Sequence, residues 1–214
     1  MSSNTPIQNF SIKAEKLCKS YGRKTVLNQV DFSFGKGGIF GITGENGSGK
    51  TTLMNIAAGY LRADKGSVIV SGSQGYCPQE TMVFMNLTIE DNINYFCRAY
   101  GIAQYSKGKP ESHHMDEIID QLGFSEYLKY ECKKLSGGTL QKINLALALI
   151  HDPDILLLDE PFAAFDWDTY LRFWDYAQKL KQKGKTIFIV SHLIYDRQNM
   201  DEILKIEKGR VLCG

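Results

Sequence analysis

The chain has 214 residues, of which 43% are hydrophobic, and a formal net charge of +1. This length is enough to bury a sizeable core as one domain, and the near-neutral charge gives no large field to attract nucleic acid. Five cysteines without any C-x-x-C spacing, Cys18, Cys77, Cys97, Cys132 and Cys213, argue against a disulfide framework or a zinc site and for a reducing compartment.

The N-terminus, MSSNTPIQNF, has no basic region followed by an apolar core, so we expect no signal peptide. The strongly apolar runs, such as ILLL at 155–158, are far shorter than the roughly 20 residues that span a bilayer. We therefore expect a cytoplasmic protein, and if a membrane is involved, it belongs to a partner. A polar stretch at 103–114 that contains Pro110 predicts a surface loop.

Runs of β-branched and apolar residues predict strands, and apolar residues at helical spacing predict helices. The expected strands are 11–17, 26–34, 38–43, 67–70, 154–159, 186–190, 202–206 and 210–212. The expected helices are 51–59, 89–100, 115–123, 140–150 and 169–184. Strands and helices alternate from Gly38 onward, after a region of strands alone. This order predicts an α/β fold, a parallel sheet covered by helices, joined to an N-terminal antiparallel β layer.

A glycine-rich loop lies between the strand at 38–43 and the helix at 51–59. Its sequence, GENGSGKT, fits G-x-x-x-x-G-K-[ST] at every fixed position. Its glycines permit a tight turn whose N–H groups face a phosphate at the helix N-terminus. A glycine-rich turn with a chance lysine is the alternative, which the flanking strand and helix disfavour. The predicted nucleotide-binding residues of this loop are Gly44, Glu45, Asn46, Gly47, Ser48, Gly49, Lys50, Thr51 and Thr52.

Two side chains of this loop have specific expected roles. Lys50 is placed to reach the β- and γ-phosphates, and the Thr51 hydroxyl is placed to ligate Mg²⁺.

A second serine- and glycine-containing stretch, LSGGTLQ at 135–141, precedes the helix expected at 140–150. Ser136 is suited to cap that helix, and Gly137 and Gly138 let backbone N–H groups come close to an anion. A plain helix N-cap accounts for Ser136 but does not explain the two glycines. The glycine-rich loop at 44–52, called the phosphate loop below, is already predicted to bind one nucleotide. The sequence therefore raises the question of which phosphate residues 135–141 would contact.

Two acidic residues, Asp159 and Glu160, follow the buried strand DILLL. Side chains at such a strand end reach a phosphate pocket beside the first loop. Asp159 is predicted to hold Mg²⁺ directly or through water, and Glu160 to orient or deprotonate the attacking water. A solvated strand end is the alternative, which the preceding apolar residues and Pro161 disfavour.

Six motifs occur in a fixed order, GENGSGKTT, GYCPQE, LSGGTLQ, ILLLDEP, AAFD and VSH. With these the chain resembles, over essentially its whole length, the nucleotide-binding subunits of ABC transporters. The resemblance implies a single ABC ATP-binding domain over 1–214, with a helical subdomain at about 80–150. It also implies an ATPase that uses ATP and Mg²⁺.

The resemblance implies roles for three further residues. Tyr21, in KSYG, would stack on adenine, although packing at a strand end is an open alternative. Gln79 would approach Mg²⁺ and the attacking water while linking the core to the helical subdomain. His192 would contact the γ-phosphate as the switch histidine. The remaining histidines, His113, His114 and His151, have no expected role.

The resemblance also answers the question raised by the second stretch. Two subunits would pack head to tail, so that residues 136–138 of one chain close over the γ-phosphate held by the other. Asp166, in AAFD, would communicate with the facing site. Thr139 stands where the family usually has glutamine, and AAFD lacks the usual serine before its aspartate.

These expectations together describe an ATP-hydrolysing subunit that dimerises around Mg-ATP, as a homodimer or with a related subunit, and powers a separate membrane permease. Residues 75–102 resemble exporter subunits more than importer subunits. One alternative is a soluble ABC-type ATPase of the Fe–S assembly or translation-factor type, although the chain has no tandem second cassette and no long coiled coil. A second alternative is a regulatory module without turnover, against which Glu160 and His192 argue.

Overall fold

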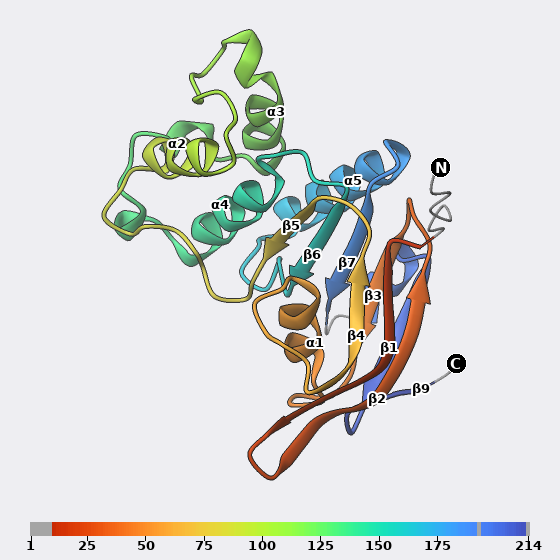
Figure 1. The fold of residues 1–214 in the computed structure, drawn as a ribbon. Helices are drawn as coiled ribbons and strands as arrows, with labels where there is room; N and C mark the ends of the chain where they lie inside the picture. The colour runs from red at the N-terminus through yellow and green to blue at the C-terminus, as the bar shows by residue number, and fades with distance from the viewer. Residues whose placement is uncertain (1–9, 192–193, 213–214) are drawn as a thin grey trace, which may run out of the picture.

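Two β-sheets form the frame of residues 10–191 and 194–212, which the computed structural model describes (Figure 1). The larger sheet has six strands in the order β5-β6-β7-β3-β8-β9. Its strands are β3 (Ile39–Thr43), β5 (Gln74–Cys77), β6 (Ile155–Asp159), β7 (Thr186–Val190), β8 (Glu202–Glu207) and β9 (Arg210–Leu212). The strands from β5 to β8 are parallel, and β9 pairs antiparallel with β8 at the edge. The predicted α/β fold with a parallel sheet is confirmed.

The smaller sheet is antiparallel, with the order β2-β1-β4 in the part of the chain that the structure describes. It consists of β1 (Ile12–Tyr21), β2 (Lys24–Phe34) and β4 (Lys65–Val70). A two-residue turn joins β1 to β2 and places Tyr21 opposite Lys24. The expected N-terminal β layer is therefore present, and the strand after the phosphate loop completes it.

Five α-helices connect and cover the strands of the described chain (Figure 1). They are α1 (Lys50–Ala57), α2 (Ile89–Ala99), α3 (His113–Leu122), α4 (Gly137–Leu149) and α5 (Trp167–Gln182), and short 3₁₀ turns lie at Pro110–Ser112, Ser125–Tyr127, Cys132–Lys134 and Ile194–Asn199. Helices α2, α3 and α4 stand together at one end of the molecule, away from the antiparallel sheet. In the described ranges, none of the helices has the length and apolar character to cross a bilayer.

The central strands are buried on both faces, as their apolar runs predict. Leu157 of β6 packs in a cluster with residues of the antiparallel sheet and α1, whereas its neighbour Leu156 packs in a cluster with residues of α3, α4 and α5. Phe188 and Ile187 of β7 divide between the two clusters in the same way. Since successive side chains of a strand point to opposite faces, the sheet separates two hydrophobic cores.

The structure differs from the sequence-based elements at several places, among them β1, which extends to Tyr21, and α5, which begins at Trp167. Strand β5 was not expected, because Gln74 and Gly75 interrupt its apolar character. Helix α4 begins at Gly137, three residues before the predicted start, because the Ser136 hydroxyl caps it by accepting a hydrogen bond from the Thr139 N–H at 3.2 Å. Helix α3 begins at His113, so the last two residues of the expected loop at 103–114 belong to the helix instead.

Candidate nucleotide-binding site

The phosphate loop, residues 44–49, joins the end of β3 to the start of α1. Gly49, just before the helix, has φ of +108°, a conformation that L side chains rarely adopt. A Cβ atom there would lie 2.8 Å from the Val26 carbonyl oxygen of β2. The loop therefore packs directly on the antiparallel sheet, and this close approach requires glycine.

Lys50 is the first residue of α1 and is only 5% exposed. Its ammonium donates hydrogen bonds to the carbonyl oxygens of Gly44 at 2.9 Å and Glu45 at 3.0 Å. Burial lowers the pKa of Lys50, while the nearby carboxylates of Glu160 and Asp159 act to raise it. The ammonium thus lies inside the curve of the loop, where a bound phosphate would meet it.

A cavity of about 540 Å³ opens beside this loop, a volume in the usual range for small-molecule sites. Its lining brings together the loop, the start of α1 and side chains far away in the sequence. The lining residues are Lys24, Val26, Asn46, Gly47, Gly49, Lys50, Thr51, Thr52, Gln79 and Glu160. Most of the predicted loop residues therefore surround one space together with Gln79 and Glu160.

The acidic side of the cavity is built at the ends of β5 and β6. Asp159, the last residue of β6, is fully buried and is not among the lining residues, whereas Glu160, which lines the cavity, follows with φ of +52°. A non-glycine residue at positive φ carries backbone strain of the kind found at functional sites. The Gln79 Nε2 donates a hydrogen bond to the Glu160 Oε2 at 3.3 Å.

The oxygen-bearing side chains around this cavity suit a hard divalent cation. The Thr51 hydroxyl, the Asp159 carboxylate and the Gln79 amide supply oxygen donors of the type that Mg²⁺ prefers. The buried Ser48 hydroxyl has no hydrogen-bond partner among the residues that the structure describes. A loop with a buried ammonium, a free hydroxyl and neighbouring oxygen donors fits a magnesium-bound polyphosphate.

Tyr21 lies outside the lining of this cavity, at the end of β1, and is 53% exposed. The Lys19 ammonium is 5.7 Å from the centre of its ring. Tyr21 is nevertheless the cross-strand partner of Lys24, which does line the cavity. His192, the predicted switch histidine, lies outside the described residues.

The serine-glycine stretch, LSGGTLQ at 135–141, does not line the cavity of its own chain. Ser136 and Gly137 are exposed at the start of α4. A Cβ atom at Gly138 would lie 2.6 Å from the Ala164 carbonyl oxygen, whereas one at Gly137 would have no described atom within 4 Å beyond its chain neighbours and the backbone of its own helix. Packing within the chain therefore explains the second glycine and leaves the first without a structural reason.

Asp166 lies just before α5 and caps it by accepting a hydrogen bond from the Thr169 N–H at 2.8 Å. This hydrogen bond lowers the pKa of the Asp166 carboxyl. The side chain is exposed, two residues beyond the Ala164 carbonyl that contacts α4. The starts of α4 and α5 therefore lie close to one another and away from the cavity lining.

Sequence reasoning missed two lining residues, Lys24 and Val26. The expected strands 11–17 and 26–34 leave residues 18–25 as a connection, whereas β1 extends to Tyr21 and β2 starts at Lys24, so that a two-residue turn joins them. That hairpin turns Lys24 back toward the side of Tyr21.

Comparison with known proteins identifies the family. The ABC transporter family profile matches residues 27–163. An uncharacterized ABC transporter ATP-binding protein of Methanocaldococcus jannaschii, MJ1023, is 34% identical over 94% of this chain and 76% of its own length. The chain belongs to the ABC transporter ATP-binding family. The family resemblance inferred from the six motifs is therefore confirmed, and this is a family of ATPases.

Other members differ from this ABC chain in length. It is 29% identical over 95% of its residues to YbhF of Escherichia coli, a probable multidrug ABC transporter ATP-binding protein, but spans only 36% of that protein. The solved dimeric structure of MJ0796, a bacterial ABC transporter cassette, has the same fold. It superposes with a TM-score of 0.85 over 94% of this chain and 97% of the cassette, at 23% identity.

Proposed function

We propose that this ABC chain hydrolyses ATP as one subunit of a dimer and thereby powers a separate membrane permease. The observation that carries the proposal is the cavity beside the phosphate loop. It gathers Lys50, Thr51, Gln79 and Glu160 from three separate parts of the sequence. These are the side chains that binding a polyphosphate and activating a water require.

Each group has a distinct proposed role. Lys50 exchanges its bonds to the loop carbonyls for contacts with the β- and γ-phosphates. Glu160 takes the proton of the attacking water, and Gln79, bonded to it at 3.3 Å, orients both partners. Bound Mg²⁺, held by Thr51, Asp159 and Gln79, would neutralise charge on the phosphates. Tyr21 would stack on adenine, and His192 would contact the γ-phosphate.

The proposed dimer gives the serine-glycine stretch a partner. Residues 136–138 lie outside the cavity of their own chain, and Gly137 has open space around it. In a head-to-tail dimer, Ser136 and the N–H groups at the start of α4 would close over the γ-phosphate of the facing chain. Asp166, the N-cap residue of α5 nearby, would meet the same interface and communicate between the two sites.

We propose the permease site on the segment that follows Gln79. Two buried asparagines hold this segment: Asn144 of α4 accepts from the Met82 N–H at 3.0 Å and donates to the Pro78 carbonyl at 2.9 Å, while Asn92 accepts from the Phe84 N–H at 2.7 Å. Movement of Gln79 at the nucleotide would thus reach α2 and α4 through short hydrogen-bonded steps.

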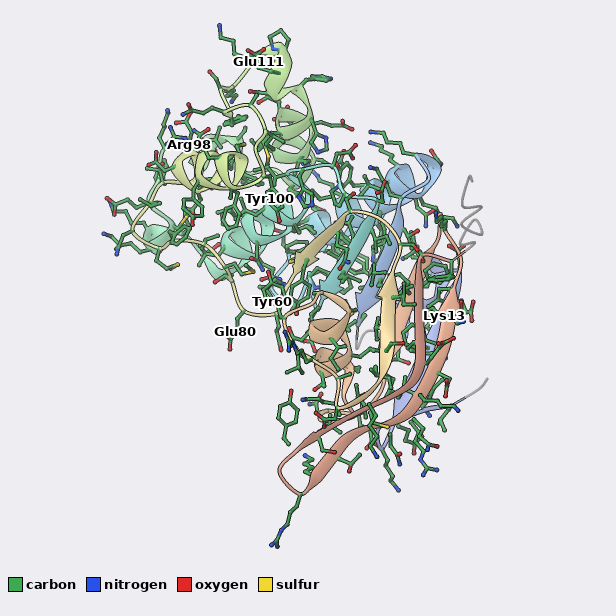
Figure 2. The ribbon with its side chains drawn as sticks, in the orientation of Figure 1. Lys13, Tyr60, Glu80, Arg98, Tyr100 and Glu111 are labelled. Atoms are coloured by element: carbon green, nitrogen blue, oxygen red, sulfur yellow. The ribbon has the colours of Figure 1, made fainter. Side chains whose placement is uncertain are left out.

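The surface around this segment is apolar. The exposed large hydrophobic residues between 82 and 102 are Met82, Phe84, Met85, Leu87, Tyr95, Tyr100 and Ile102. A hollow of about 100 Å³ lies beside them, lined in part by Tyr60 and Tyr100, which Figure 2 labels where the helical region meets the core. Apolar surface of this kind marks a protein interface. We assign it to the permease, which would hold the chain peripherally on the cytoplasmic face of the membrane.

Two finer parts of the proposal rest on the sequence and on the relatives. Residues 1–214 would act as one ATP-binding domain, with the helical part at about 80–150 as its permease-facing subdomain. Export is favoured over import, because residues 75–102 resemble exporter subunits and the relative YbhF is named a probable multidrug transporter component.

The test of this proposal uses two inactive variants, Lys50→Ala and Ser136→Arg. Each spoils both sites of its own homodimer. A mixture forms heterodimers in which one site combines both defects and the other pairs an intact phosphate loop with an intact serine-glycine stretch. We expect phosphate release and ATP-dependent dimerisation to return in the mixture, measured by a phosphate assay and size-exclusion chromatography.

If residues 136–138 served the nucleotide of their own chain, every site in the mixture would still carry one defect. Neither activity nor an ATP-dependent heterodimer, with both variants folded by circular dichroism, would refute the shared site. Absence of ATP hydrolysis by the unmodified chain, both alone and in membranes of its native host, would refute the proposed enzyme itself.

A further inference from the structure

The turn between β1 and β2 places a lysine at the nucleotide cavity. The register pairs Tyr21 with Lys24 across the two-residue turn of Gly22 and Arg23. Directly opposite residues of an antiparallel pair project from the same face of the sheet. Lys24 lines the cavity, whereas Arg23 does not. The hairpin therefore presents one of its two neighbouring cations to the cavity.

The Lys24 ammonium is available for a ligand. Among the described residues it forms neither a hydrogen bond nor an ion pair, whereas Lys19 of the same sheet is bound to Asp64 at 2.8 Å. Lys50, the other cation of the cavity lining, already has Asp159 and Glu160 near it. A triphosphate carries more negative charge than one ammonium balances, so a second cation in the same cavity favours its binding.

The position of Lys24 indicates which phosphates it meets. Val26, two residues further along β2, lies beneath Gly49 at the start of α1. The Gln79 and Glu160 pair comes instead from the ends of β5 and β6, which lie on a different side of α1 from the hairpin in Figure 1. Since Glu160 is placed for the attacking water, the γ-phosphate belongs on its side. Lys24 then lies near the end of the triphosphate that is closer to the nucleotide base.

We propose that Lys24 is a nucleotide-binding residue whose ammonium contacts the α- or β-phosphate, the groups that ATP and ADP share. The inference rests on the proposed nucleotide site and adds a specific contact to it. Lys24 would favour nucleoside polyphosphates over uncharged nucleosides without distinguishing ATP from ADP. Its contribution would be a charge-assisted contact at an exposed position.

The experiment is titration calorimetry of the full chain with Mg-ATP and with Mg-ADP. The variants are Lys24→Ala and Lys24→Arg, and the matched control is Arg23→Ala, which removes a cation from the same turn. We expect Lys24→Ala to weaken both nucleotides by about tenfold, the size of one charge-assisted hydrogen bond. Lys24→Arg should restore most of the affinity, and Arg23→Ala should change it by less than twofold.

The outcomes separate this inference from the proposed function. If the unmodified chain binds neither nucleotide, the proposed nucleotide site itself fails. If the unmodified chain binds both and Lys24→Ala binds them equally well, Lys24 is not a contact. A loss confined to ATP would overturn the assignment to the shared phosphates. An equal loss of nucleotide affinity in Arg23→Ala would show that the positive charge of the turn acts through long-range electrostatics, and it would overturn a specific contact by Lys24.

Discussion

At the scale of single residues, Glu160 combines a strained backbone with a defined partner. It has φ of +52° directly after β6, and its carboxylate accepts a hydrogen bond from Gln79. The unusual backbone conformation and the hydrogen bond from Gln79 together hold the Glu160 carboxylate at the cavity. Such pre-organisation is what the proposed action of Glu160 on the attacking water requires.

Glu160→Gln should separate binding from turnover. The amide keeps the shape of the side chain but removes the basic oxygen, so we expect ATP binding to persist while kcat falls by about 10²-fold or more. The variant should accumulate as an ATP-bound dimer in size-exclusion chromatography. Glu80→Gln is the matched control, because Glu80 neighbours Gln79 in the sequence but is exposed and lies outside the cavity lining.

Normal hydrolysis by Glu160→Gln, together with a monomer in Mg-ATP, would show that another group activates the water. A similar loss of kcat in Glu80→Gln would show that removing a nearby negative charge, and not removing a base, lowers the rate.

At the scale of elements, the two glycines at the start of α4 have different reasons to be small. Gly138→Ala would bring a Cβ to 2.6 Å from the Ala164 carbonyl oxygen, so α4 and the segment before α5 must separate. We expect a loss of about 1–3 kcal/mol in the free energy of unfolding, the usual cost of overpacking. Gly137→Ala, with open space around the added atom, should leave stability unchanged within about 1 kcal/mol.

Urea denaturation measures both changes, and dimerisation in the Glu160→Gln background gives the second readout. If Gly137 lies against the nucleotide of a facing chain, Gly137→Ala should weaken ATP-dependent dimerisation in a protein of normal stability. Equal stability of the two alanine variants would show that the contact between α4 and Ala164 yields easily.

The sequence predicts those elements whose signal is local. The apolar runs of β6 and β7 and the loop before α1 were all recognisable, because burial on both faces and phosphate binding impose strict residue patterns. Strand β5 escaped because an edge strand of four residues, with Gln74 and Gly75 at its start, needs no such pattern. Lys24 escaped because its place at the cavity comes from pairing across a turn, which no motif encodes.

At the scale of the whole molecule, the apolar surface around α2 should decide where the protein resides in the cell. Tyr95 is 51% exposed on α2, and Tyr95→Glu places a charge on the proposed permease interface. We expect the tagged variant to leave the membrane fraction of its native host while its ATPase activity as an isolated protein is unchanged. The matched control is Ile69→Glu, a similarly exposed apolar site on β4 of the antiparallel sheet.

Retention of Tyr95→Glu in the membrane fraction would place the permease contact elsewhere. Loss of both variants from the membrane would indicate a general effect of added negative charge.

The strand order of the larger sheet has a consequence for folding during synthesis on the ribosome. The phosphate loop follows β3 and Glu160 follows β6, and β7 lies between these two strands in the sheet. Strand β7 leaves the ribosome after both of them. A nascent chain that ends before Thr186 therefore contains every lining residue of the nucleotide cavity yet lacks the strand that brings them together. Nucleotide capture during translation should begin only when β7 has emerged and inserted, late in synthesis.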